Sequence, residues 1–301
     1  MTYDVIIIGG SYSGLAAALQ VARARRKVLV VDAGERRNRF AESSHGFLTQ
    51  DGTPAAQIAR VGREQLLAYP NVTWIDARAE NVQGALDAFT VRISSGMSYE
   101  GQRLILATGV TDILPTIPGL RERWGKSVFH CPYCHGYELG TGPIGVLATS
   151  ALSTHQAAML ADWGNTTLFV NGMFEPDSDQ INALTGRGVR IEYAAIVSIA
   201  GKDTRPIVEV ADGRAISLAG LFTLSRTAVT GPLPQQLGCA MEDGLLGTYI
   251  KTEDTKLTSV PGVYACGDTA LMAGSVSFAV GDGVRAGVSA HQSLIFSSPA
   301  H

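Results

Sequence analysis

The side chains best suited to chemistry in this sequence form one short run, His130-Cys131-Pro132-Tyr133-Cys134-His135. Two cysteines separated by two residues can close a small ring that is easily reduced, and one thiol of such a pair often has its pKa lowered to about 7. Pro132 suits the first position of a helix, which would place Cys131 near the positive N-terminal end and favour its thiolate. The run therefore predicts a redox-active cysteine pair.

Half of a structural zinc site is the alternative reading of the same pair, and it requires a second pair of ligands. The chain has four cysteines, and the two others, Cys239 and Cys266, stand alone. Cys239 has apolar neighbours and is expected to be a small core residue. His130 and His135 lie too close along the chain to replace a distant ligand pair. Redox chemistry is favoured, and no metal is expected.

The composition is that of an ordinary globular protein, with 301 residues, 46% hydrophobic, 17% charged and a formal net charge of −3. This length allows two domains. The small net charge gives no reason to expect nucleic acid or an anionic membrane as a partner. The apolar N-terminal run, residues 5–8, is too short for a signal sequence, and no run approaches the roughly twenty apolar residues of a membrane span. Four cysteines in a chain of this size are not a secreted disulfide framework, so we expect a cytoplasmic protein.

The N-terminal residues have the layout of a dinucleotide-binding unit. Residues 3–8 predict a strand buried on both faces of a parallel sheet. A glycine-bearing turn, residues 9–14, then leads into a helix at residues 15–25, and a second buried strand at residues 28–31 ends in Asp32. In such a unit the helix N-terminus faces a pyrophosphate and the acid accepts hydrogen bonds from ribose hydroxyls. The plain alternative is a βαβ unit that binds no nucleotide.

The fingerprint departs from the usual pattern at its middle glycine, where this chain has Ser11, a side chain small enough to keep the prediction. His45 lies in a polar loop before a helix near residues 54–69, where exposed polar groups are often only solvated. The cofactor contacts that we expect in this part of the chain are Gly9, Gly10, Ser11, Tyr12, Ser13, Gly14, Asp32, Ala33, His45 and Ala79.

Two later strand ends also carry candidate cofactor contacts. Residues 104–107 predict a buried strand that ends in Thr108-Gly109, a small-residue turn against which a cofactor can lie. Residues 263–266 predict another strand, followed by Gly267-Asp268, whose acid can bond the hydroxyls of a ribityl chain. Val276 lies before a predicted helix at residues 278–294, whose free N–H groups can face the edge of a flavin ring.

A second βαβ unit follows the cysteine pair. A strand at residues 144–147 precedes a helix that ends near Asp162, and the next strand, residues 167–170, ends at Asn171. Aligned on the first unit without a gap, Ala148 replaces Gly9, Ser153 replaces Gly14 and Asn171 replaces Asp32. The residues after this strand are acidic (Glu175, Asp177 and Asp179), where the 2′-phosphate of NADPH would need Arg or Lys. We therefore expect NADPH binding to be weak or absent; a tolerant loop that still binds NAD(P)H poorly is the alternative.

These features together resemble the low-molecular-weight thioredoxin reductase family over nearly the whole chain. The order is the 9–14 fingerprint, Ala107-Thr108-Gly109, the pair Cys131–Cys134, the second βαβ unit and Tyr264-Ala265-Cys266-Gly267-Asp268. The resemblance implies an α/β fold of two Rossmann-like, three-layer nucleotide-binding domains, the second inserted in the first. It also implies bound FAD and a homodimer.

The domain boundaries follow from this organisation and from breaks at Pro115 and Gly231. We expect residues 1–114 and 242–301 to form an FAD-binding domain. Residues 115–241 would form an NAD(P)H-type domain that carries the cysteine pair. Further strands are expected at residues 72–75, 88–93, 189–198, 207–210 and 219–224.

Two departures from the reductases point to one branch of the family. The run Cys-Pro-Tyr-Cys-His-Gly replaces the reductase pattern Cys-Ala-Thr-Cys-Asp-Gly, and the second fingerprint is erased. In both respects the chain looks more like the FAD-dependent dithiol oxidases that close the disulfides of gliotoxin, holomycin and depsipeptide-type natural products, in which oxygen reoxidises the flavin.

The resemblance also implies roles for the residues around the cysteine pair. Cys131 would exchange with the substrate thiol, and Cys134 would lie nearer the flavin and pass the electron pair to it. His135 occupies the position of the reductases' acid–base aspartate and is expected to titrate near neutral pH. His130 is the second candidate base, with simple packing as its alternative.

The resulting hypothesis is an FAD-dependent oxidase that converts a small-molecule dithiol to a disulfide with oxygen as acceptor. One rival is an NADPH-dependent thioredoxin-disulfide reductase, with a thioredoxin-like protein as partner; rapid anaerobic bleaching of the flavin by NADPH would favour it. The other is a flavin redox sensor, against which multiple turnover with a dithiol and oxygen would argue.

Overall fold

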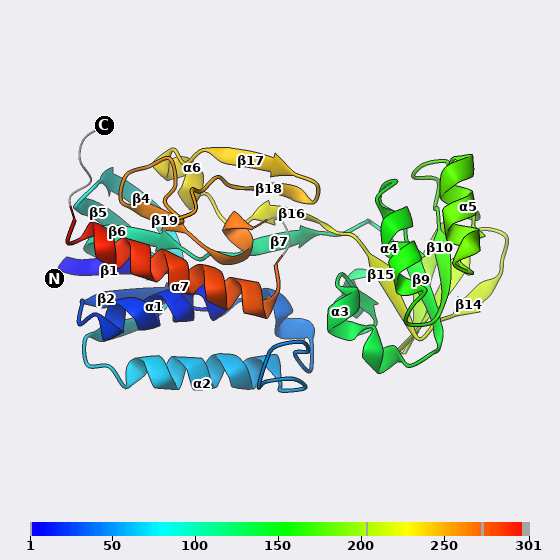
Figure 1. Ribbon diagram of the computed structural model, residues 1–301, viewed down its shortest axis with the longest axis horizontal. Helices are drawn as coiled ribbons and strands as arrows, with labels where there is room; N and C mark the ends of the chain where they lie inside the picture. The colour runs from blue at the N-terminus through cyan, green and yellow to red at the C-terminus, as the bar shows by residue number, and fades with distance from the viewer. Residues whose placement is uncertain (1, 203, 272–273, 297–301) are drawn as a thin grey trace. The chain divides into compact units, whose positions relative to one another are not determined.

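The computed structural model describes residues 2–202, 204–271 and 274–296 of the chain (Figure 1). The chain divides into two compact units. The first contains Met1–Arg39, Ala55–Thr111 and Thr227–His301, and the second contains Phe40–Pro54 and Asp112–Arg226. The second unit thus interrupts the first along the chain.

The first unit is built on a seven-stranded sheet with the order β3-β2-β1-β6-β5-β4, in which β19 also pairs with β6. Strands β1, β2, β3 and β19 pair in parallel, whereas β4 and β5 extend β6 antiparallel. The strands are β1 (Thr2–Ile8), β2 (Val28–Asp32), β3 (Val72–Asp76), β4 (Ala79–Ala85), β5 (Ala88–Ile93), β6 (Ser98–Leu106) and β19 (Val263–Ala265). Its helices are α1 (Tyr12–Arg23), α2 (Ala55–Leu67), α6 (Leu233–Leu237) and α7 (Val276–Ser293), with short 3₁₀ turns η1 (Arg37–Phe40) and η4 (Gly267–Ala270).

Small residues let α1 and α7 pack closely beside this sheet. A Cβ added at Gly283 would lie 2.1 Å from the carbonyl oxygen of Ser13. One added at Gly287 would lie 2.5 Å from the carbonyl oxygen of Ala17. The helix that ends the described chain is therefore held against the first helix, as the predicted return to the N-terminal domain requires.

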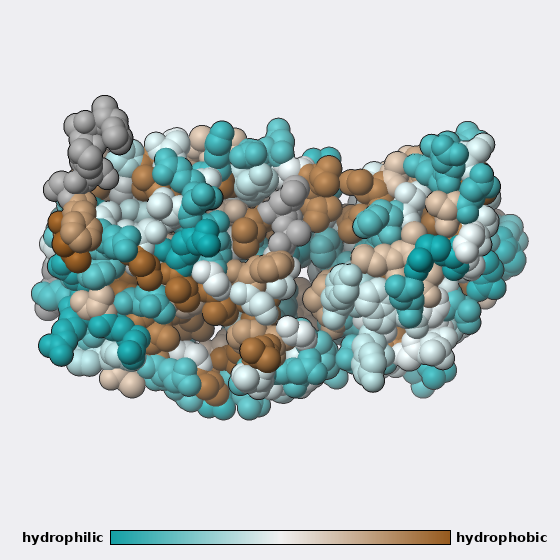
Figure 2. All heavy atoms as spheres, in the orientation of Figure 1, coloured by the Kyte–Doolittle hydropathy of each residue, from teal (hydrophilic) through white to brown (hydrophobic). Residues whose placement is uncertain are grey.

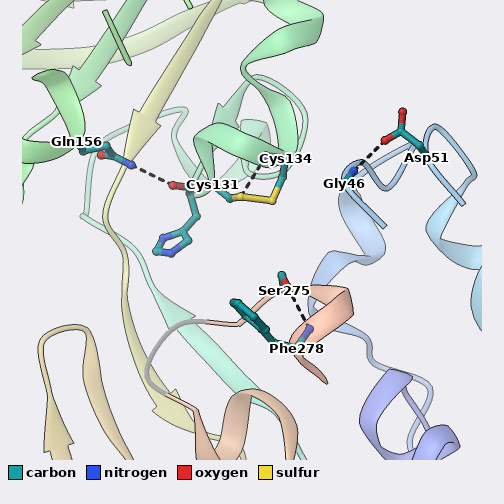
Figure 3. Close-up of a disulfide and its surroundings, with 8 residues drawn as sticks. Gly46, Asp51, Cys131, Cys134, Gln156, Ser275 and Phe278 are labelled. Atoms are coloured by element: carbon teal, nitrogen blue, oxygen red, sulfur yellow. Dashed lines mark hydrogen bonds between the residues drawn. A yellow bond between two sulfur atoms is a disulfide. The ribbon is translucent and has the colours of Figure 1, made fainter. Parts of the chain in front are cut away.

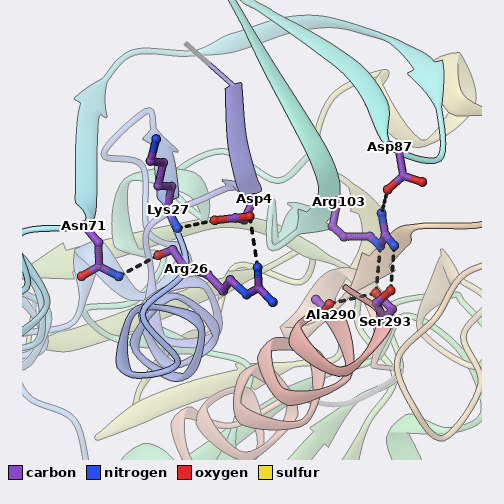
Figure 4. Close-up of polar contacts among 8 residues, drawn as sticks. All are labelled: Asp4, Arg26, Lys27, Asn71, Asp87, Arg103, Ala290 and Ser293. Carbon is purple, nitrogen blue, oxygen red and sulfur yellow. Dashed lines mark hydrogen bonds and ion pairs between the residues drawn. The ribbon is translucent and has the colours of Figure 1, made fainter. Parts of the chain in front are cut away.

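Arg103 ties the end of α7 to the sheet (Figure 4). Its Nε donates to the Ser293 hydroxyl and its Nη2 to the Ser293 carbonyl, each at 2.8 Å. Its Nη1 forms an ion pair with Asp87 in the turn between β4 and β5. Arg103 is only 5% exposed, and a buried guanidinium needs such partners because burial of an unpaired charge is costly. The contacts join the end of α7 to a part of the sheet that lies 190 residues earlier in the sequence.

Residues 227–241 belong to the first unit, so the chain returns to it earlier than the sequence predicts. Leu233 and Cys239 are buried in the same core cluster as Val82. Gln236 Oε1 also accepts a hydrogen bond from the Val82 backbone N–H at 2.9 Å. The expectation that Cys239 is a small core residue is confirmed.

Strands β7 and β16 carry the chain between the units, and the division falls within both. They belong to a four-stranded sheet with the order β17-β18-β16-β7. The crossing after Thr111 lies close to the predicted boundary after residue 114, whereas the assignment of Phe40–Pro54 to the second unit differs from the prediction, which gave all of residues 1–114 to the first domain. The strands are β7 (Val110–Ile113), β16 (Arg226–Val229), β17 (Met241–Gly244) and β18 (Gly247–Ile250).

The second unit has a five-stranded sheet with the order β11-β10-β9-β15-β8, parallel at every pairing, and a three-stranded antiparallel sheet, β12-β13-β14. Its strands are β8 (Val128–Phe129), β9 (Pro143–Leu147), β10 (Asn165–Phe169), β11 (Arg190–Glu192), β12 (Ile196–Lys202), β13 (Arg205–Val210), β14 (Ala215–Ser217) and β15 (Gly220–Thr223). Its helical segments are η2 (Arg121–Arg123), α3 (Pro132–His135), η3 (Tyr137–Leu139), α4 (Ser153–Leu160) and α5 (Ser178–Gly186).

Figure 2 shows hydrophilic side chains spread over the visible face of each unit, among scattered hydrophobic ones. Within the described part of the chain, no helix is both long and apolar enough to span a membrane.

Candidate active site and cofactor site

The turn after β1 leaves no room for side chains at its glycines. Gly9 has φ +103°, and a Cβ there would lie 2.2 Å from the carbonyl oxygen of Ala107. A Cβ at Gly14 would lie 1.8 Å from the Gly9 carbonyl oxygen, and one at Gly10 would lie 2.2 Å from the Trp74 ring. The close packing of this turn against Ala107 and Trp74 is possible only because glycine is present, and such a glycine turn before a helix is typical of a pyrophosphate site.

Asp32 closes the turn from the end of β2. Its Oδ1 accepts a hydrogen bond from the Gly10 backbone N–H at 2.9 Å. Ser11 is the N-cap of α1, and its side chain makes no capping hydrogen bond. The first turn of the 12-residue helix α1 also contains no acidic side chain. This helix N-terminus therefore suits an anion.

The loop after β2 adds polar groups that sequence reasoning missed. Arg37 Nη1 pairs with Asp268 Oδ2 at 2.9 Å. Asn38 Nδ2 donates to the Tyr12 hydroxyl at 3.0 Å, while Asn38 Oδ1 is buried without a hydrogen-bond partner among the described residues. The basic run of residues 36–39, a few positions after Asp32, is the sequence signal that would have drawn attention to them.

Helix α7 fixes the Gly267-Asp268 turn through a hydrogen bond. Gly267 has φ +74°, and its N–H donates to Asp282 Oδ2 at 2.9 Å. Asp282 Oδ1 in turn forms an ion pair with Lys256 Nζ at 2.6 Å. A Cβ at Gly274 would lie 1.9 Å from Asp268 Oδ1. The carboxylate of Asp268 thus sits in a fixed turn beside a second glycine.

Helix α7 begins at Val276, two residues earlier than the sequence predicts, because Ser275 caps it. The Ser275 hydroxyl accepts a hydrogen bond from the Phe278 N–H at 3.2 Å (Figure 3). One N–H of the first turn is therefore already satisfied. Thr108 is another predicted contact, and its hydroxyl oxygen lies 3.4 Å from the hydroxyl oxygen of Thr269.

The predicted cofactor residues divide between the units. Most are in the first unit: Gly9, Gly10, Ser11, Tyr12, Ser13, Gly14, Asp32, Ala33, Ala79, Thr108, Gly109, Gly267, Asp268 and Val276. Ala79 is the first residue of β4 and packs against the core. His45 belongs to the second unit, where its Nδ1 lies 3.3 Å from Glu138 Oε1. In the same loop Asp51 accepts from the Gly46 N–H (Figure 3).

The redox pair forms a disulfide at the start of α3 (Figure 3). Pro132 occupies the first turn of that helix, and Cys131 is its N-cap residue, as the sequence predicts. Cys131 Sγ accepts a hydrogen bond from the Cys134 backbone N–H at 3.1 Å. This donor would stabilise negative charge on Cys131 once the disulfide opens.

His135 does not titrate where the sequence predicts. Its ring stacks on Phe129 with centroids 4.3 Å apart and planes inclined by 22°. Burial, and to a lesser degree the nearby His45, lowers the pKa of His135 to about 4. The expectation of a pKa near neutral pH is wrong because burial against an aromatic ring disfavours the imidazolium. His135 is therefore uncharged at neutral pH.

His130 lies in a chain of polar contacts. Its Nδ1 is 3.3 Å from Ser225 Oγ, and Ser225 Oγ donates to Asp112 Oδ1 at 2.7 Å. Its carbonyl oxygen accepts from Gln156 Nε2 at 3.0 Å (Figure 3). Ser225 is fully buried and Gln156 is 2% exposed. This network is what only the folded chain reveals, since no local pattern marks Ser225 or Asp112.

The second βαβ unit differs from the first in strand register. In the first unit, Gly9 N donates to the carbonyl oxygen of the residue before Asp32 at 2.8 Å. In the second, Ala148 N donates to the carbonyl oxygen of the residue before Val170 at 3.0 Å. Val170, rather than the predicted Asn171, therefore occupies the position of the ribose-binding acid. The ungapped alignment missed this one-residue difference.

Residue Asn171 has a structural task instead. Its φ is +52°, and its Oδ1 accepts a hydrogen bond from the Ile196 N–H at 2.8 Å. Asn tolerates this left-handed conformation better than most residues. Its side chain therefore fastens the end of β10 to β12.

The chain matches the pyridine nucleotide-disulphide oxidoreductase family over residues 3–290. With the fold and the disulfide described above, this match shows that the chain belongs to that family. It is a flavoprotein disulfide oxidoreductase of the thioredoxin reductase type, and the family implies a flavin cofactor. The expected fold is confirmed.

The chain is also similar to individual members of this family. The chain is 32% identical to "Thioredoxin reductase tcpT" of Claviceps purpurea, covering 97% of this chain and 94% of the relative. A solved oxidoreductase from Agrobacterium tumefaciens is 54% identical, with 99% of this chain and 100% of that chain covered and a TM-score of 0.96. The solved structure of HlmI is 37% identical, with 98% and 93% covered and a TM-score of 0.89.

Proposed function

We propose that this protein is an FAD-dependent dithiol oxidase: it converts a small dithiol to a disulfide and delivers the electron pair to oxygen. The observation that carries the proposal is in the second nucleotide-type unit, where the first N–H groups of α4 are bonded to the preceding loop instead of free for a phosphate. A disulfide unit that cannot take electrons from NADPH must receive them from its dithiol substrate.

The first N–H groups of helix α4 already have partners. The N–H of Ser153 and those of the two residues after it donate to carbonyl oxygens three positions earlier. Thr149 N donates to the Ser153 hydroxyl at 3.1 Å, as its counterpart Gly10 donates to Asp32 in the first unit. The first turn of α4 therefore has these donors occupied, and a pyrophosphate binds through N–H groups of this kind.

The residues that follow β10 also disfavour NADPH. Val170, in place of the ribose-binding acid, offers no hydrogen-bond acceptor on its side chain. Asp177 caps α5 by accepting from the Gln180 N–H at 2.8 Å, and Asp179 adds a second acid in the first turn of α5. A 2′-phosphate in this region would meet negative charge.

The cofactor site fits FAD in the first unit. The glycine turn and the N-terminus of α1 would hold the pyrophosphate, and Asp32 would bond the adenosine ribose. Asp268 would bond the ribityl hydroxyls, and the unpartnered Asn38 Oδ1 is a further acceptor. Bound FAD would supply the two-electron acceptor that oxygen reoxidises, with hydrogen peroxide as product.

The thiol chemistry takes place at the disulfide. A substrate thiolate attacks Cys131 Sγ, the S–S bond breaks, and Cys134 leaves as a thiolate. The second substrate thiolate then attacks the substrate sulfur of this mixed disulfide, and Cys131 leaves. The Cys134 N–H that donates to Cys131 Sγ favours this second departure. The product is the substrate disulfide, and the electron pair resides on the two cysteines until it passes to the cofactor.

Aromatic rings beside the disulfide suit a small apolar substrate. Tyr133, between the two cysteines, is 71% exposed. Its ring meets Trp163 edge to face, with centroids 5.3 Å apart. An exposed ring held in this way offers apolar contact area at little cost in side-chain entropy.

Anaerobic titration of the holoprotein tests the direction of electron flow. Dithiothreitol should bleach the flavin absorbance, NADPH should not, and oxygen should restore it. Cys134→Ser should retain FAD yet fail to bleach with dithiothreitol, with Cys239→Ser as the control for a cysteine outside the site. Rapid bleaching by NADPH would refute the proposal.

A thioredoxin reductase is the second candidate, because relatives carry that name. It would use NADPH and reduce a thioredoxin-like protein, so the same titration distinguishes the two functions. For either function we expect a cytoplasmic homodimer. Light scattering of the holoprotein, expected at about twice the 31.7 kDa chain mass, checks the dimer.

A further inference from the structure

We propose that His130 is the base of the thiol–disulfide exchange, and that Ser225 and Asp112 are positioning residues that hold its imidazole in the Nδ1–H tautomer. This inference rests on the dithiol chemistry proposed above for the same site. It assigns the basic role to His130 rather than to His135, and it adds two residues that lie far from the cysteines in sequence.

The tautomer follows from counting hydrogens. A carboxylate only accepts hydrogen bonds, and a serine hydroxyl has one hydrogen to donate. The shorter contact, 2.7 Å from Ser225 Oγ to Asp112 Oδ1, therefore takes the hydroxyl hydrogen. The remaining contact, 3.3 Å between Ser225 Oγ and His130 Nδ1, is then made by a proton on Nδ1. The lone pair of the neutral ring is left on Nε2.

The surrounding structure holds this network on both sides. Gln156 on α4 donates to the His130 carbonyl oxygen at 3.0 Å. Thr149, in the loop before α4, donates from Oγ1 to the carbonyl oxygen of Leu224 at 2.9 Å, next to Ser225. The loop and helix that would hold a nucleotide in the second βαβ unit thus hold the two segments that carry the His130–Ser225 contact.

The geometry disfavours His135 for the same task. Its ring is stacked on Phe129, and no hydrogen bond to its imidazole is found in the described residues. A ring without such a partner has no preferred tautomer. His130, by contrast, directly precedes Cys131 and has its orientation set by a buried partner.

The proton of the substrate thiol moves to His130 Nε2, and the resulting thiolate attacks Cys131 Sγ while the disulfide electrons go to Cys134. The imidazolium keeps its Nδ1–H bond to Ser225, and Asp112 lies at the far end of the chain to stabilise the positive charge through the hydroxyl. The proton is then released to solvent.

Nitrogen-15 spectra of the histidine-labelled, oxidised holoprotein test the tautomer without any turnover. Two-bond correlations distinguish a protonated Nδ1 from a protonated Nε2, and His130→Gln identifies the signal among the six histidines of the chain. The expected result is a protonated Nδ1 in the wild type and in Ser225→Thr, and its loss in Ser225→Ala. A protonated Nε2 in the wild type, or an unchanged signal in Ser225→Ala, would overturn the proposal.

Ser127→Ala is the matched control for the serine substitution. Ser127 is 1% exposed in the same unit, and its hydroxyl has no hydrogen-bond partner among the described residues. Any general effect of removing a buried hydroxyl should therefore appear in this variant too, whereas the change in tautomer should not.

The rate of a single exchange tests the role of the base. Under argon, the oxidised protein is mixed with dithiothreitol, and the released thiols are alkylated and counted by mass spectrometry. General bases contribute about 100- to 10,000-fold, so Ser225→Ala should slow the exchange at least about tenfold at saturating dithiothreitol. Ser127→Ala and Ser225→Thr should remain within about twofold of the wild type. Equal rates in Ser225→Ala and Ser127→Ala would refute the role.

This exchange needs neither oxygen nor NADPH, so its outcome is independent of whether the protein is an oxidase or a reductase. Failure of aerobic dithiol turnover in the wild type would overturn the proposed function alone. If Ser225→Ala loses the Nδ1-protonated signal and exchanges slowly with dithiothreitol, the role of Ser225 in positioning His130 would still be supported.

Discussion

Gly14→Ala is the sharpest test that the first unit holds the cofactor. The added Cβ would lie 1.8 Å from the Gly9 carbonyl oxygen and 3.4 Å from Ala107 Cβ. Side-chain Cβ atoms essentially never come closer than 3.0 Å to such a neighbour. Because both neighbours of the clash are backbone or core, α1 and the turn must separate by roughly 1 Å, and a displacement of that size can cost about 100-fold in a preorganised site.

Overpacking of this kind also costs about 1–3 kcal/mol of folding free energy. Ala is the better helix former by about 1 kcal/mol, which offsets part of that cost. Gly14→Ala should therefore fold with a slightly reduced melting temperature, and its affinity for FAD should fall about 100-fold. Protein-bound flavin absorbance after dialysis, and titration of the apoprotein with FAD, measure the effect.

Gly281→Ala is the matched control, because it is also a glycine inside a helix. A Cβ at Gly281 would meet nothing within 4 Å. The substitution should retain FAD and raise stability by about 0.5–1 kcal/mol through helix propensity alone. If Gly14→Ala does not fold, Asp32→Ala provides the second test, since it removes only the acceptor of the Gly10 N–H and of the ribose. Wild-type FAD affinity in both Gly14→Ala and Asp32→Ala would refute the assignment.

Three further predictions concern single side chains. Arg37→Ala removes the ion pair to Asp268 and should weaken FAD binding about tenfold, because a charged hydrogen bond contributes about 1.5–3 kcal/mol; an unchanged dissociation constant would argue against a cofactor role for this loop. Lys256→Met leaves Asp282 buried without the cation that lies 2.6 Å from it in the native chain. This should cost about 3–5 kcal/mol of stability, measured as a fall in melting temperature together with loss of FAD. A variant that keeps both its melting temperature and its FAD would show that the ion pair is dispensable. Folding lowers the pKa of His135 from 6.5 to about 4, so between these pH values the unfolded chain binds more protons than the folded one. The free energy of unfolding should therefore keep its full His135 contribution above pH 6.5 and lose it toward pH 4, by up to about 3 kcal/mol. His135→Gln should flatten that part of the profile of melting temperature against pH, and an identical slope in the variant would contradict the stated cause.

Several features were predictable from the sequence because they depend on neighbours along the chain. The Cys131–Cys134 pair, with Pro132 in the first turn of its helix, needs only four consecutive residues to specify a small disulfide ring. The turn from Gly9 to Gly14 and the alternation of buried strands with amphipathic helices are likewise local patterns. The family resemblance then supplied the insertion of one α/β unit into the other, which the structure and the comparisons confirm.

Other predictions missed because a contact between distant residues decided them. Residues 227–241 pack on the first unit through Leu233 and Gln236, although turn signals alone suggested a later boundary. Strand β10 pairs one residue out of step with the ungapped alignment, so Val170 replaces Asn171 at the position of the acid. Strand pairing is set by the neighbouring strand and by burial, and neither is visible in a single segment.

What the sequence by itself determined is the chemistry that this protein has available: a cysteine pair, two flanking histidines, one dinucleotide fingerprint that departs only at Ser11 and one that has lost its glycines. Only the tertiary structure decided how those groups behave. Burial against Phe129 lowers the pKa of His135, and a serine that lies 95 residues from His130 in the sequence meets its Nδ1. Protonation and tautomer depend on desolvation and on hydrogen-bond partners in space, and the fold alone brings those partners together.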